Sequence, residues 1–289
     1  NITHFFLNYN KDLELNDFEE SSLDLQIEKV SNDTYLKVFQ NNLIETPVMP
    51  SSKDVMKSKV EFDLTHEMYD FSADLKIFED LSKIHSDRYE YVLPNYSFSK
   101  NLDLDLLDAD INFFSSGSNH LKNTNNLRTS ITNDIEIKSR DYFTTNGFKN
   151  NFNLYFKNLN SVGKNDPTYK SSPRVEGMNI AEFKSSYPLI KNSLTKEEIL
   201  TPQISIRVNP GNNMKDNSSS NRTLNVNNIF DINRLAISDS FESGRSLTLG
   251  LDYRIDKIEN SEINSNEENE LSVKDKYINF KIATVLRDK

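Results

Sequence analysis

Apolar and polar residues alternate along most of the chain. Alternation with a period of two predicts strands with one apolar face, because successive side chains of a strand point to opposite sides. The pattern is clear at residues 23–27, 60–64, 73–77, 102–106, 131–137, 152–156, 204–208, 247–255 and 278–282. Two weaker strand candidates, 35–39 and 89–98, bring the expected total to roughly a dozen. Helical spacing is nowhere sustained, and the capping-box-like segment 195–198 is expected to form a turn.

Two connections between these segments are long and polar, at residues 209–243 and 256–274, whereas others are as short as 139–141. The first connection has an apolar second half. Five apolar residues occur there without a turn residue between them: Ile229, Phe230, Ile232, Leu235 and Ile237. Leaving apolar surface in water costs about 25 cal/mol per Å². The sequence therefore predicts that this loop packs against the protein.

Alternation with connections of unequal length fits two architectures. In a soluble sandwich the apolar face forms the core, whereas in an outer-membrane barrel it meets lipid and the charged face lines the lumen. Few segments are continuously apolar, as the centre of a sandwich would be. Segment 247–255 also approaches the roughly 9 to 11 residues that cross a bilayer at a tilt. These two points favour the barrel, but the alternation itself leaves both architectures open.

Composition excludes several classes. No apolar run exceeds three residues, so a transmembrane helix of about 20 apolar residues is not expected. The net charge of −10 argues against nucleic acid as a partner. The chain has no cysteine, which removes disulfides and thiolate metal sites. It shows no signal peptide, and both ends lack turn or capping chemistry, so we expect a piece of a longer chain.

Catalytic and metal motifs are missing from the sequence. The histidines, His4, His66, His85 and His120, are scattered without metal-ligand spacing. Asp108, Asp110 and Asn112 follow the start of a calcium loop, but Phe113 replaces its required glycine. We therefore expect no enzymatic activity, no catalytic residue, no metal and no cofactor.

Three segments carry a resemblance to a known family. Residues 199–211, the Asn228-Ile-Phe-Asp-Ile-Asn-Arg heptapeptide and residues 239–250 resemble the barrel signature of the lipopolysaccharide-assembly outer-membrane proteins, the LptD or organic solvent tolerance family. The aromatic-Pro-aliphatic segment 187–189 and the turn at 29–35 are also similar. The resemblance spans about residues 23–255 and is specific over 199–254. Ile237, Ser240 and Thr201 depart from the usual glycine, arginine and glutamate, and the paired cysteines of relatives have no counterpart.

The resemblance implies a fold and a function. The fold is an all-β, antiparallel outer-membrane β-barrel segment, a single partial transmembrane domain over residues 1–289 with a long extracellular loop at 209–243 that folds inward. The function is to assemble lipopolysaccharide into the outer leaflet of the bacterial outer membrane. The implied partners are lipopolysaccharide, outer-membrane lipid, an LptE-like plug lipoprotein in the lumen, and the periplasmic Lpt bridge, reached through an N-terminal domain outside this sequence.

The resemblance and the pleat of the strands together assign site residues. Candidates for contact with the loop or the plug are Asn228, Phe230, Asn233, Arg234 and Asp239. Pro202, Gly244 and Gly250 are expected to be structural, and Arg207, Asp252 and Arg254 to face the lumen. Leu247, Leu249 and Leu251 are expected to face lipid, with Thr248 on the lumenal side. Arg234 is the expected polar anchor of the loop, with Asp239, Glu242 and Asp252 as its nearest carboxylates.

Two rival functions stay open from the sequence. The first is a soluble extracellular β-sandwich or solenoid that binds a polymer through its loops. The second is a diffusion porin.

Overall fold

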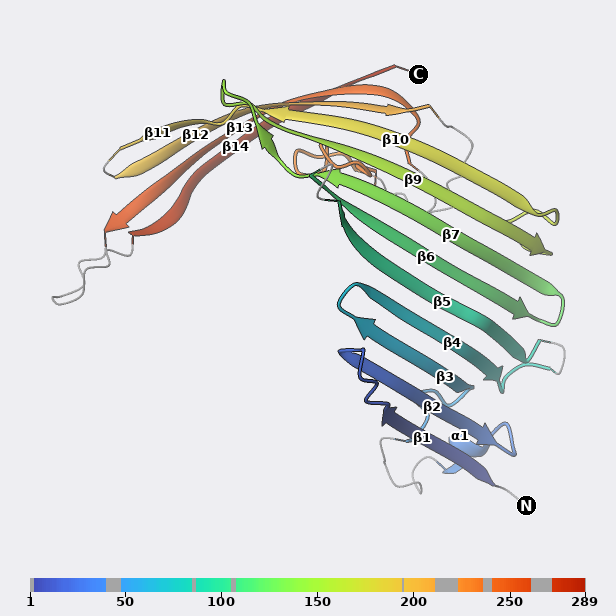
Figure 1. Ribbon diagram of the computed structural model, residues 1–289. Helices are drawn as coiled ribbons and strands as arrows, with labels where there is room; N and C mark the ends of the chain where they lie inside the picture. The colour runs from blue at the N-terminus through green and yellow to red at the C-terminus, as the bar shows by residue number, and fades with distance from the viewer. Residues whose placement is uncertain are drawn as a thin grey trace. The chain divides into compact units, whose positions relative to one another are not determined.

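A computed structural model describes residues 3–39, 48–84, 87–104, 108–193, 195–210, 223–235, 241–260 and 272–288 (Figure 1). Within these residues the chain forms fourteen strands and one short helix. No helix in the described ranges is both long enough and apolar enough to cross a membrane.

The first half of the chain contributes the helix α1 (Tyr35–Phe39) and the strands β1 (His4–Asp12), β2 (Glu20–Val30), β3 (Val55–His66), β4 (Tyr69–Asp80), β5 (Tyr89–Leu104), β6 (Ala109–Lys122) and β7 (Asn126–Ser139). The second half contributes β8 (Tyr142–Phe143), β9 (Lys149–Lys164), β10 (Arg174–Ser186), β11 (Leu189–Asn192), β12 (Lys196–Asn209), β13 (Gly244–Asn260) and β14 (Ser272–Asp288).

The strands belong to one sheet whose order follows the sequence, β1-β2-β3-β4-β5-β6-β7-β9-β10-β12-β13-β14, with β8 paired to β9 and β11 to β12. The residue pairings from β1 to β5 and from β10 to β14 are antiparallel. Within the described residues, β1 and β14 are the two ends of the path of paired strands. The predicted antiparallel all-β fold of an incomplete barrel is confirmed.

Three local predictions were wrong. Residues Tyr35–Phe39 form α1 and not a strand. Lys196 begins β12, so segment 195–198 is not a turn. The predicted connection 256–274 is shorter, because β13 continues to Asn260 and β14 begins at Ser272. In the first two cases a pattern of a few residues was too short to override the pairing or packing that neighbouring elements offer.

The chain divides into two compact units. Unit 1 comprises residues 1–103, 111–135 and 157–176, and unit 2 comprises residues 104–110, 136–156 and 177–289. The single domain expected from the sequence stays a prediction.

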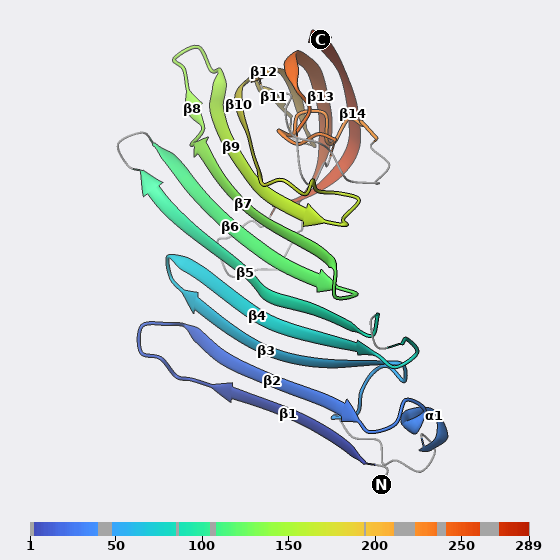
Figure 2. The ribbon, with the colours of Figure 1, turned by 90° about the vertical axis from the view of Figure 1, so that its right-hand side faces the viewer.

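In unit 1 the sheet has an apolar and a polar face. The register aligns Tyr9, Leu25, Val60 and Leu75 on one face, where Val60 and Leu75 are 40% and 47% exposed. Figure 2 shows β1 to β4 side by side in sequence order. On the opposite face, neighbouring strands place polar residues in register: Asn10, Asp24, Glu61, Asp74 and Asn95.

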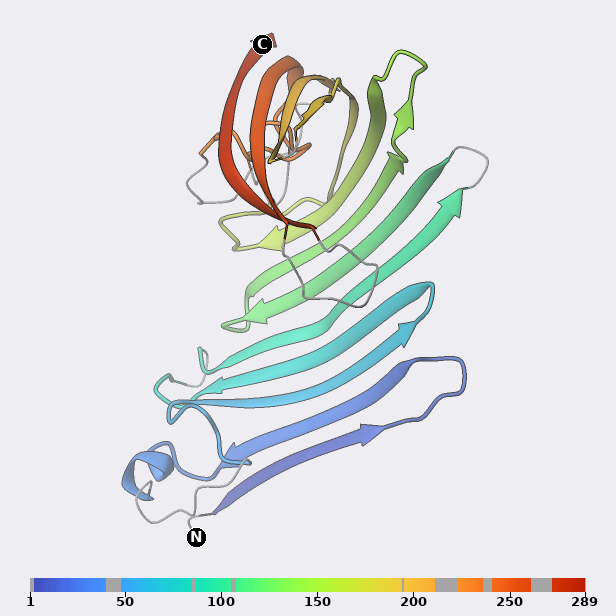
Figure 3. The same cartoon turned by 90° about the vertical axis from the view of Figure 1, so that its left-hand side faces the viewer.

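The buried apolar cluster of unit 1 lies at one end of its strands. Val30, Tyr35, Leu36, Met56 and Leu81 are all buried there, with Phe6 and Phe39 packed against them. Figures 2 and 3 both place α1 beside the end of β2. Tyr35 of α1 thus packs against the end of β2. This packing explains why the segment Tyr35–Phe39 is apolar although it is not a strand.

In unit 2 the division between the faces is sharper. Cross-strand pairing aligns Ile206, Leu247 and Leu286 on the apolar face, where Ile206 is 48% and Leu286 57% exposed. One residue along each strand, Arg207, Ser246 and Arg287 are aligned on the polar face. Arg207 is only 3% exposed and Ser246 6%. Burial is thus reversed relative to a soluble domain, in which apolar side chains are the buried ones.

Candidate functional site

The described part of the long connection, residues 223–235, lies on the polar face of unit 2 and is called the docked loop below. Ile229 is 9% exposed and Arg234 3%. The ring of Phe230 lies over Gly250, so closely that a Cβ at Gly250 would come within 2.6 Å of the ring Cζ. Glycine at position 250 therefore provides the space in which Phe230 packs. The apolar half of the loop covers the sheet, as its composition predicts.

The start of the docked loop is organised by its own asparagines. The Oδ1 of Asn225 accepts hydrogen bonds from the backbone N–H groups of Asn227 (2.9 Å) and Asn228 (3.2 Å). The side chain of Asn228 donates to the carbonyl of Thr223 at 2.9 Å and accepts from the N–H of Asn225 at 2.9 Å. Asparagine side chains stabilise turns in this way because they can replace a backbone partner. Asn228 thus shapes the loop.

Arg234 is held by an acidic residue at the other end of the connection. Its Nε donates to the Oε2 of Glu242 at 2.6 Å, and its Nη1 lies 3.5 Å from the Oγ1 of Thr248 on β13. The side chains of Arg234 and Glu242 are 2% and 8% exposed. A charge-assisted hydrogen bond in a site with this little solvent is stronger than a surface ion pair.

Two further arginines from the strands converge on Glu242. The Nη1 of Arg287 on β14 lies 2.9 Å from the Oε1 of Glu242, and the Nη1 of Arg207 on β12 is 4.0 Å from Oε2. Arg207, Arg234, Glu242 and Arg287 are called the anchor cluster below. Within the described residues, the Nε and Nη2 of Arg207 and the Nη2 of Arg234 are buried without a hydrogen-bond partner. One carboxylate therefore serves three guanidinium groups.

The protonation of Glu242 is coupled to this arrangement. Burial alone would raise the pKa of the Glu242 carboxyl, but the hydrogen bond from Arg234 and the charges of Arg234, Arg287 and Arg207 together lower it below its ordinary value of 4.5. The carboxylate therefore stays ionised at neutral pH, which is the state that the arginines require.

The position of Glu242 is fixed by the residues around it. Asn209, the last residue of β12, donates from Nδ2 to the carbonyl of Glu242 at 3.0 Å. The ring of Phe241 packs on Tyr155 of β9, with the centroids 4.7 Å apart. Gly244 has φ +95°, and a Cβ there would meet the carbonyl oxygen of Asp288 at 2.7 Å. The backbone around Glu242 thus depends on a glycine, as expected for a conformation with positive φ.

The other predicted site residues are placed as follows. Asp239 lies outside the described residues, and Asn233 is half-buried in the docked loop. Asp252 contacts Lys281 at 3.4 Å and Arg254 contacts Asp256 at 2.6 Å, both on the polar face of unit 2. Pro202 is exposed and pairs with Leu251 on the apolar face. Asp252, Arg254 and Pro202 thus lie apart from the anchor cluster.

Sequence reasoning missed part of the cluster. It singled out Arg234 and Arg207 separately, named Glu242 only as one of three carboxylates, and did not consider Arg287. The signal for Arg287 was available: it alternates with Leu286 at the end of a strand and therefore lies on the polar face. Its partner is 45 positions away, so the pairing itself required the register of β13 and β14.

One group of carboxylates in the described residues lies close enough together to hold a metal ion, Asp24, Glu61 and Asp63 of unit 1. Lys59 already contacts Glu61, and the amide of Asn10 contacts Asp24. Local partners therefore account for these acids, and we assign no metal to them.

The sequence was compared with protein-family models and with curated proteins. No protein-family model matches the chain, and no curated protein matches it either.

Proposed function

We propose that the chain is part of an outer-membrane β-barrel that assembles lipopolysaccharide into the outer leaflet, as the resemblance to the LptD family implies. The observation that carries the proposal is the reversed burial of the sheet. Lipid is the solvent in which an exposed apolar face and a covered charged face are both favourable, because a charge in contact with hydrocarbon costs several kcal/mol and an apolar side chain costs nothing.

The apolar face of unit 2 is continuous across strands. Leu249 is 39% exposed and Ile282 57%, in the same face as Ile206 and Leu286. Isolated exposed apolar residues need no explanation, but a contiguous patch marks a surface that another apolar phase covers. Acyl chains are the covering phase under this proposal.

The docked loop supports the more specific part of the proposal. In the family, a long extracellular loop folds into the barrel and contacts a plug lipoprotein. Here Phe230 and Arg234, both in the segment that resembles the family, are the residues by which the loop is fixed to the polar face. A loop fixed inside the lumen of a barrel narrows that lumen. A narrowed lumen suits directed lipid export better than free diffusion of solutes through a porin.

The soluble sandwich is the rival that the burial pattern disfavours. A sandwich would bury Ile206 and Leu286 between two sheets, whereas both are half exposed. The two hypotheses differ in a simple observation. The barrel segment should aggregate in water and acquire β structure in micelles, so a soluble monomer in plain buffer would contradict the proposal.

The function is tested in the full-length protein. Arg234→Ala should weaken association with the plug lipoprotein and raise sensitivity to large hydrophobic antibiotics, because an outer leaflet with less lipopolysaccharide becomes permeable to them. Lipopolysaccharide at the surface of intact cells, quantified with a membrane-impermeant label, should fall.

The matched control is Arg245→Ala, which removes an exposed arginine of β13 outside the anchor cluster. It should leave surface lipopolysaccharide and antibiotic sensitivity near the wild-type level. Equal effects of the two substitutions would refute the role of the docked loop, and normal surface lipopolysaccharide in cells without the protein would refute the function.

A further inference from the structure

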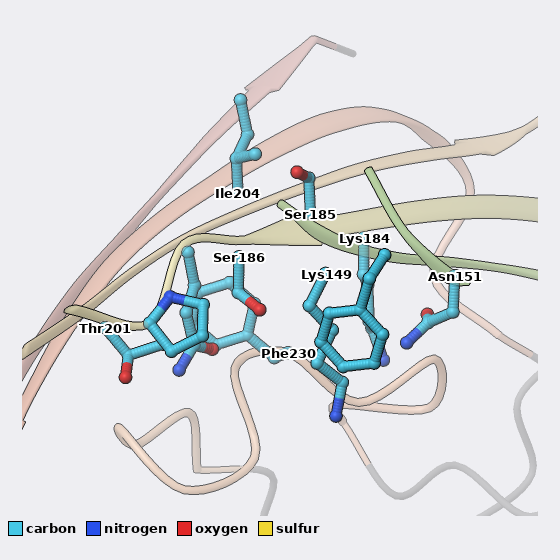
Figure 4. Close-up of a pocket in the computed structure, with 11 residues that line it drawn as sticks. Lys149, Asn151, Lys184, Ser185, Ser186, Thr201, Ile204 and Phe230 are labelled. Carbon is cyan, nitrogen blue, oxygen red and sulfur yellow. The ribbon is translucent and has the colours of Figure 1, made fainter. Parts of the chain in front are cut away.

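A cavity lies beside the docked loop on the polar face of unit 2. Its volume is about 510 Å³, and its lining includes Lys149 and Asn151 of β9, Lys184 of β10, Gln203 of β12 and Phe230 of the docked loop. Figure 4 shows Lys149, Lys184 and Phe230 on one side of the sheet, with Ile204 and Ser185 on the other. The volume is within the roughly 300 to 1,000 Å³ of small-molecule sites. The cavity is therefore large enough for an organic ligand.

Two lysines supply positive charge to this cavity. Lys184 is 3.1 Å from the Oε2 of Glu182, a carboxylate that also accepts from Ser205 and Asn153. Lys149 is 2.7 Å from the Oδ2 of Asp141. An ammonium group has three N–H donors. Each lysine is thus oriented by one carboxylate and keeps donors for a ligand.

Asn151 supplies a buried acceptor to this cavity. Its Nδ2 donates to the Oδ1 of Asp141 at 2.9 Å, which fixes the orientation of the amide. Hydrogen bonds from Lys149 and from Asn151 lower the pKa of the Asp141 carboxyl, so this orienting group stays charged. The Oδ1 of Asn151 is buried and has no hydrogen-bond partner within the described residues. A buried acceptor of this kind needs a donor, and a ligand hydroxyl is such a donor.

Apolar and neutral polar groups complete the lining. The lining also includes Phe230 of the docked loop, which supplies an aromatic ring. Thr201 and Gln203 of β12 supply a hydroxyl and an amide. A sugar ring matches this mixture, because its C–H face is apolar and its edge carries hydroxyls that both donate and accept. Neither an acyl chain nor a bare inorganic anion would use the aromatic ring, the amides and the lysines together.

We infer that this cavity is a binding site for a sugar ring that carries an anionic group, with Lys149 and Lys184 on the anion, Asn151 on a hydroxyl and Phe230 on the ring face. The inference rests on the proposed function, in which a glycolipid passes the polar face. It adds a defined site and the ligand chemistry of that site. The same chemistry is found in a phosphorylated glycolipid headgroup and in a free sugar phosphate.

The test is saturation-transfer NMR on the chain in amine-oxide micelles, which contain neither sugar nor phosphate. The probes are glucose 6-phosphate, glucose and inorganic phosphate. Glucose 6-phosphate should bind about tenfold more tightly than glucose, the equivalent of about 1.4 kcal/mol from charge-assisted hydrogen bonds. Inorganic phosphate should displace glucose 6-phosphate only at a concentration much higher than that of the sugar phosphate.

The double variant Lys149→Met and Lys184→Met should lose the preference for glucose 6-phosphate over glucose, and Phe230→Ala should weaken both sugars. Lys191→Met is the matched control, because Lys191 is an exposed lysine of β11 outside the cavity. Circular dichroism checks that each variant keeps its β structure.

Three results would overturn the inference. The first is no saturation transfer to either sugar. The second is an affinity for glucose 6-phosphate in the double variant equal to that of the wild type, and the third is displacement of bound glucose by inorganic phosphate at the same concentration as by glucose 6-phosphate. A final titration with lipopolysaccharide separates the two ligand sources. Displacement of bound glucose 6-phosphate assigns the site to the lipid-borne sugar. If glucose 6-phosphate stays bound, the site is assigned to a free sugar phosphate. Sugar binding can fail while surface lipopolysaccharide still depends on Arg234, so this inference and the proposed function fail separately.

Discussion

The polar faces of the two units satisfy their charges in different ways. In unit 1, polar residues of adjacent strands pair with one another: the amide of Asn95 donates to Asp74 at 2.7 Å, and Lys59 contacts Glu61 on the same strand. Lys59 and Glu61 remain 21% and 23% exposed. In unit 2, a segment of the chain covers the face, and the side chains of Arg207, Arg234 and Glu242 are at most 8% exposed.

The difference shows that the polar face of a sheet can either stay in contact with solvent or be covered by another segment of the same chain. Pairing along the strands leaves Lys59 and Glu61 in contact with water, so the loss of one of these partners is compensated by solvent. Covering the face removes that compensation. The energetic weight of a residue therefore depends on whether the loop lies over it, and four substitutions or conditions test this statement.

The largest effect is expected for Glu242→Gln. The substitution leaves three guanidinium groups without their shared carboxylate, and breaking a buried ion pair costs about 3 to 5 kcal/mol. Since Arg287 is 43% exposed, the lower end applies. Tryptic cleavage after Arg234, measured by mass spectrometry in micelles, should accelerate by about two orders of magnitude. Unchanged cleavage would show that apolar packing alone fixes the loop.

Acidification should release the loop by the same route. The lowered pKa of Glu242 means that the carboxylate favours the docked state; this contribution is fully present above the ordinary pKa of 4.5 and is lost as pH falls through the lower folded value. Pepsin cleavage near Phe230 should therefore rise below pH 4.5 in the wild type. Glu242→Gln should already be sensitive and show no such step. A step above that window would indicate another titrating group.

A smaller effect is expected for Gly250→Ala. The added Cβ would lie 2.6 Å from Phe230 Cζ, so the ring must move. Overpacking of this kind costs about 1 to 3 kcal/mol. Cleavage after Arg234 should rise by about tenfold, which corresponds to about 1.4 kcal/mol. Phe230→Leu in the same chain should restore slow cleavage by making space, and failure of this rescue would mean that the methyl group disturbs the strand and not the loop.

The smallest effect is expected for Glu61→Gln in unit 1. The residue is partly solvated and lies near Asp24 and Asp63, so the removal of its charge also removes repulsion. The free energy of unfolding in urea should change by about 0.5 kcal/mol or less. A change comparable to that of Glu242→Gln would erase the distinction between the two faces.

Much of the fold could be predicted from the sequence, because a period of two needs only local information. Segment 247–255 was expected as a strand with leucines on one face, and β13 places them so. Tyr35–Phe39 was misassigned because its apolar residues pack against Val30 and Met56, which no local pattern reveals.

The candidate site was predictable only in part. The apolar character of the connection indicated that it packs on the protein, and the arginine that fixes it was named. Its carboxylate could not be chosen among Asp239, Glu242 and Asp252, since the choice depends on how the connection returns to β13. The cavity was not foreseen, because Lys149, Lys184 and Phe230 belong to three separate segments, which strand pairing and the packing of the docked loop bring together.

The apolar rows of unit 2 also set a length. From Leu247 to Ile255 the apolar residues of β13 extend over eight positions, or about 26 Å along the strand at about 3.3 Å per residue. A tilt of about 45° would reduce this to a band about 19 Å tall, shorter than the hydrocarbon core of about 30 Å in an average bilayer. Under the proposed function, a protein with such a band fits thin membranes best, and the bacterial outer membrane is thinner than average. The proposal therefore predicts that bilayer thickness, set by acyl-chain length, governs where the protein inserts most readily.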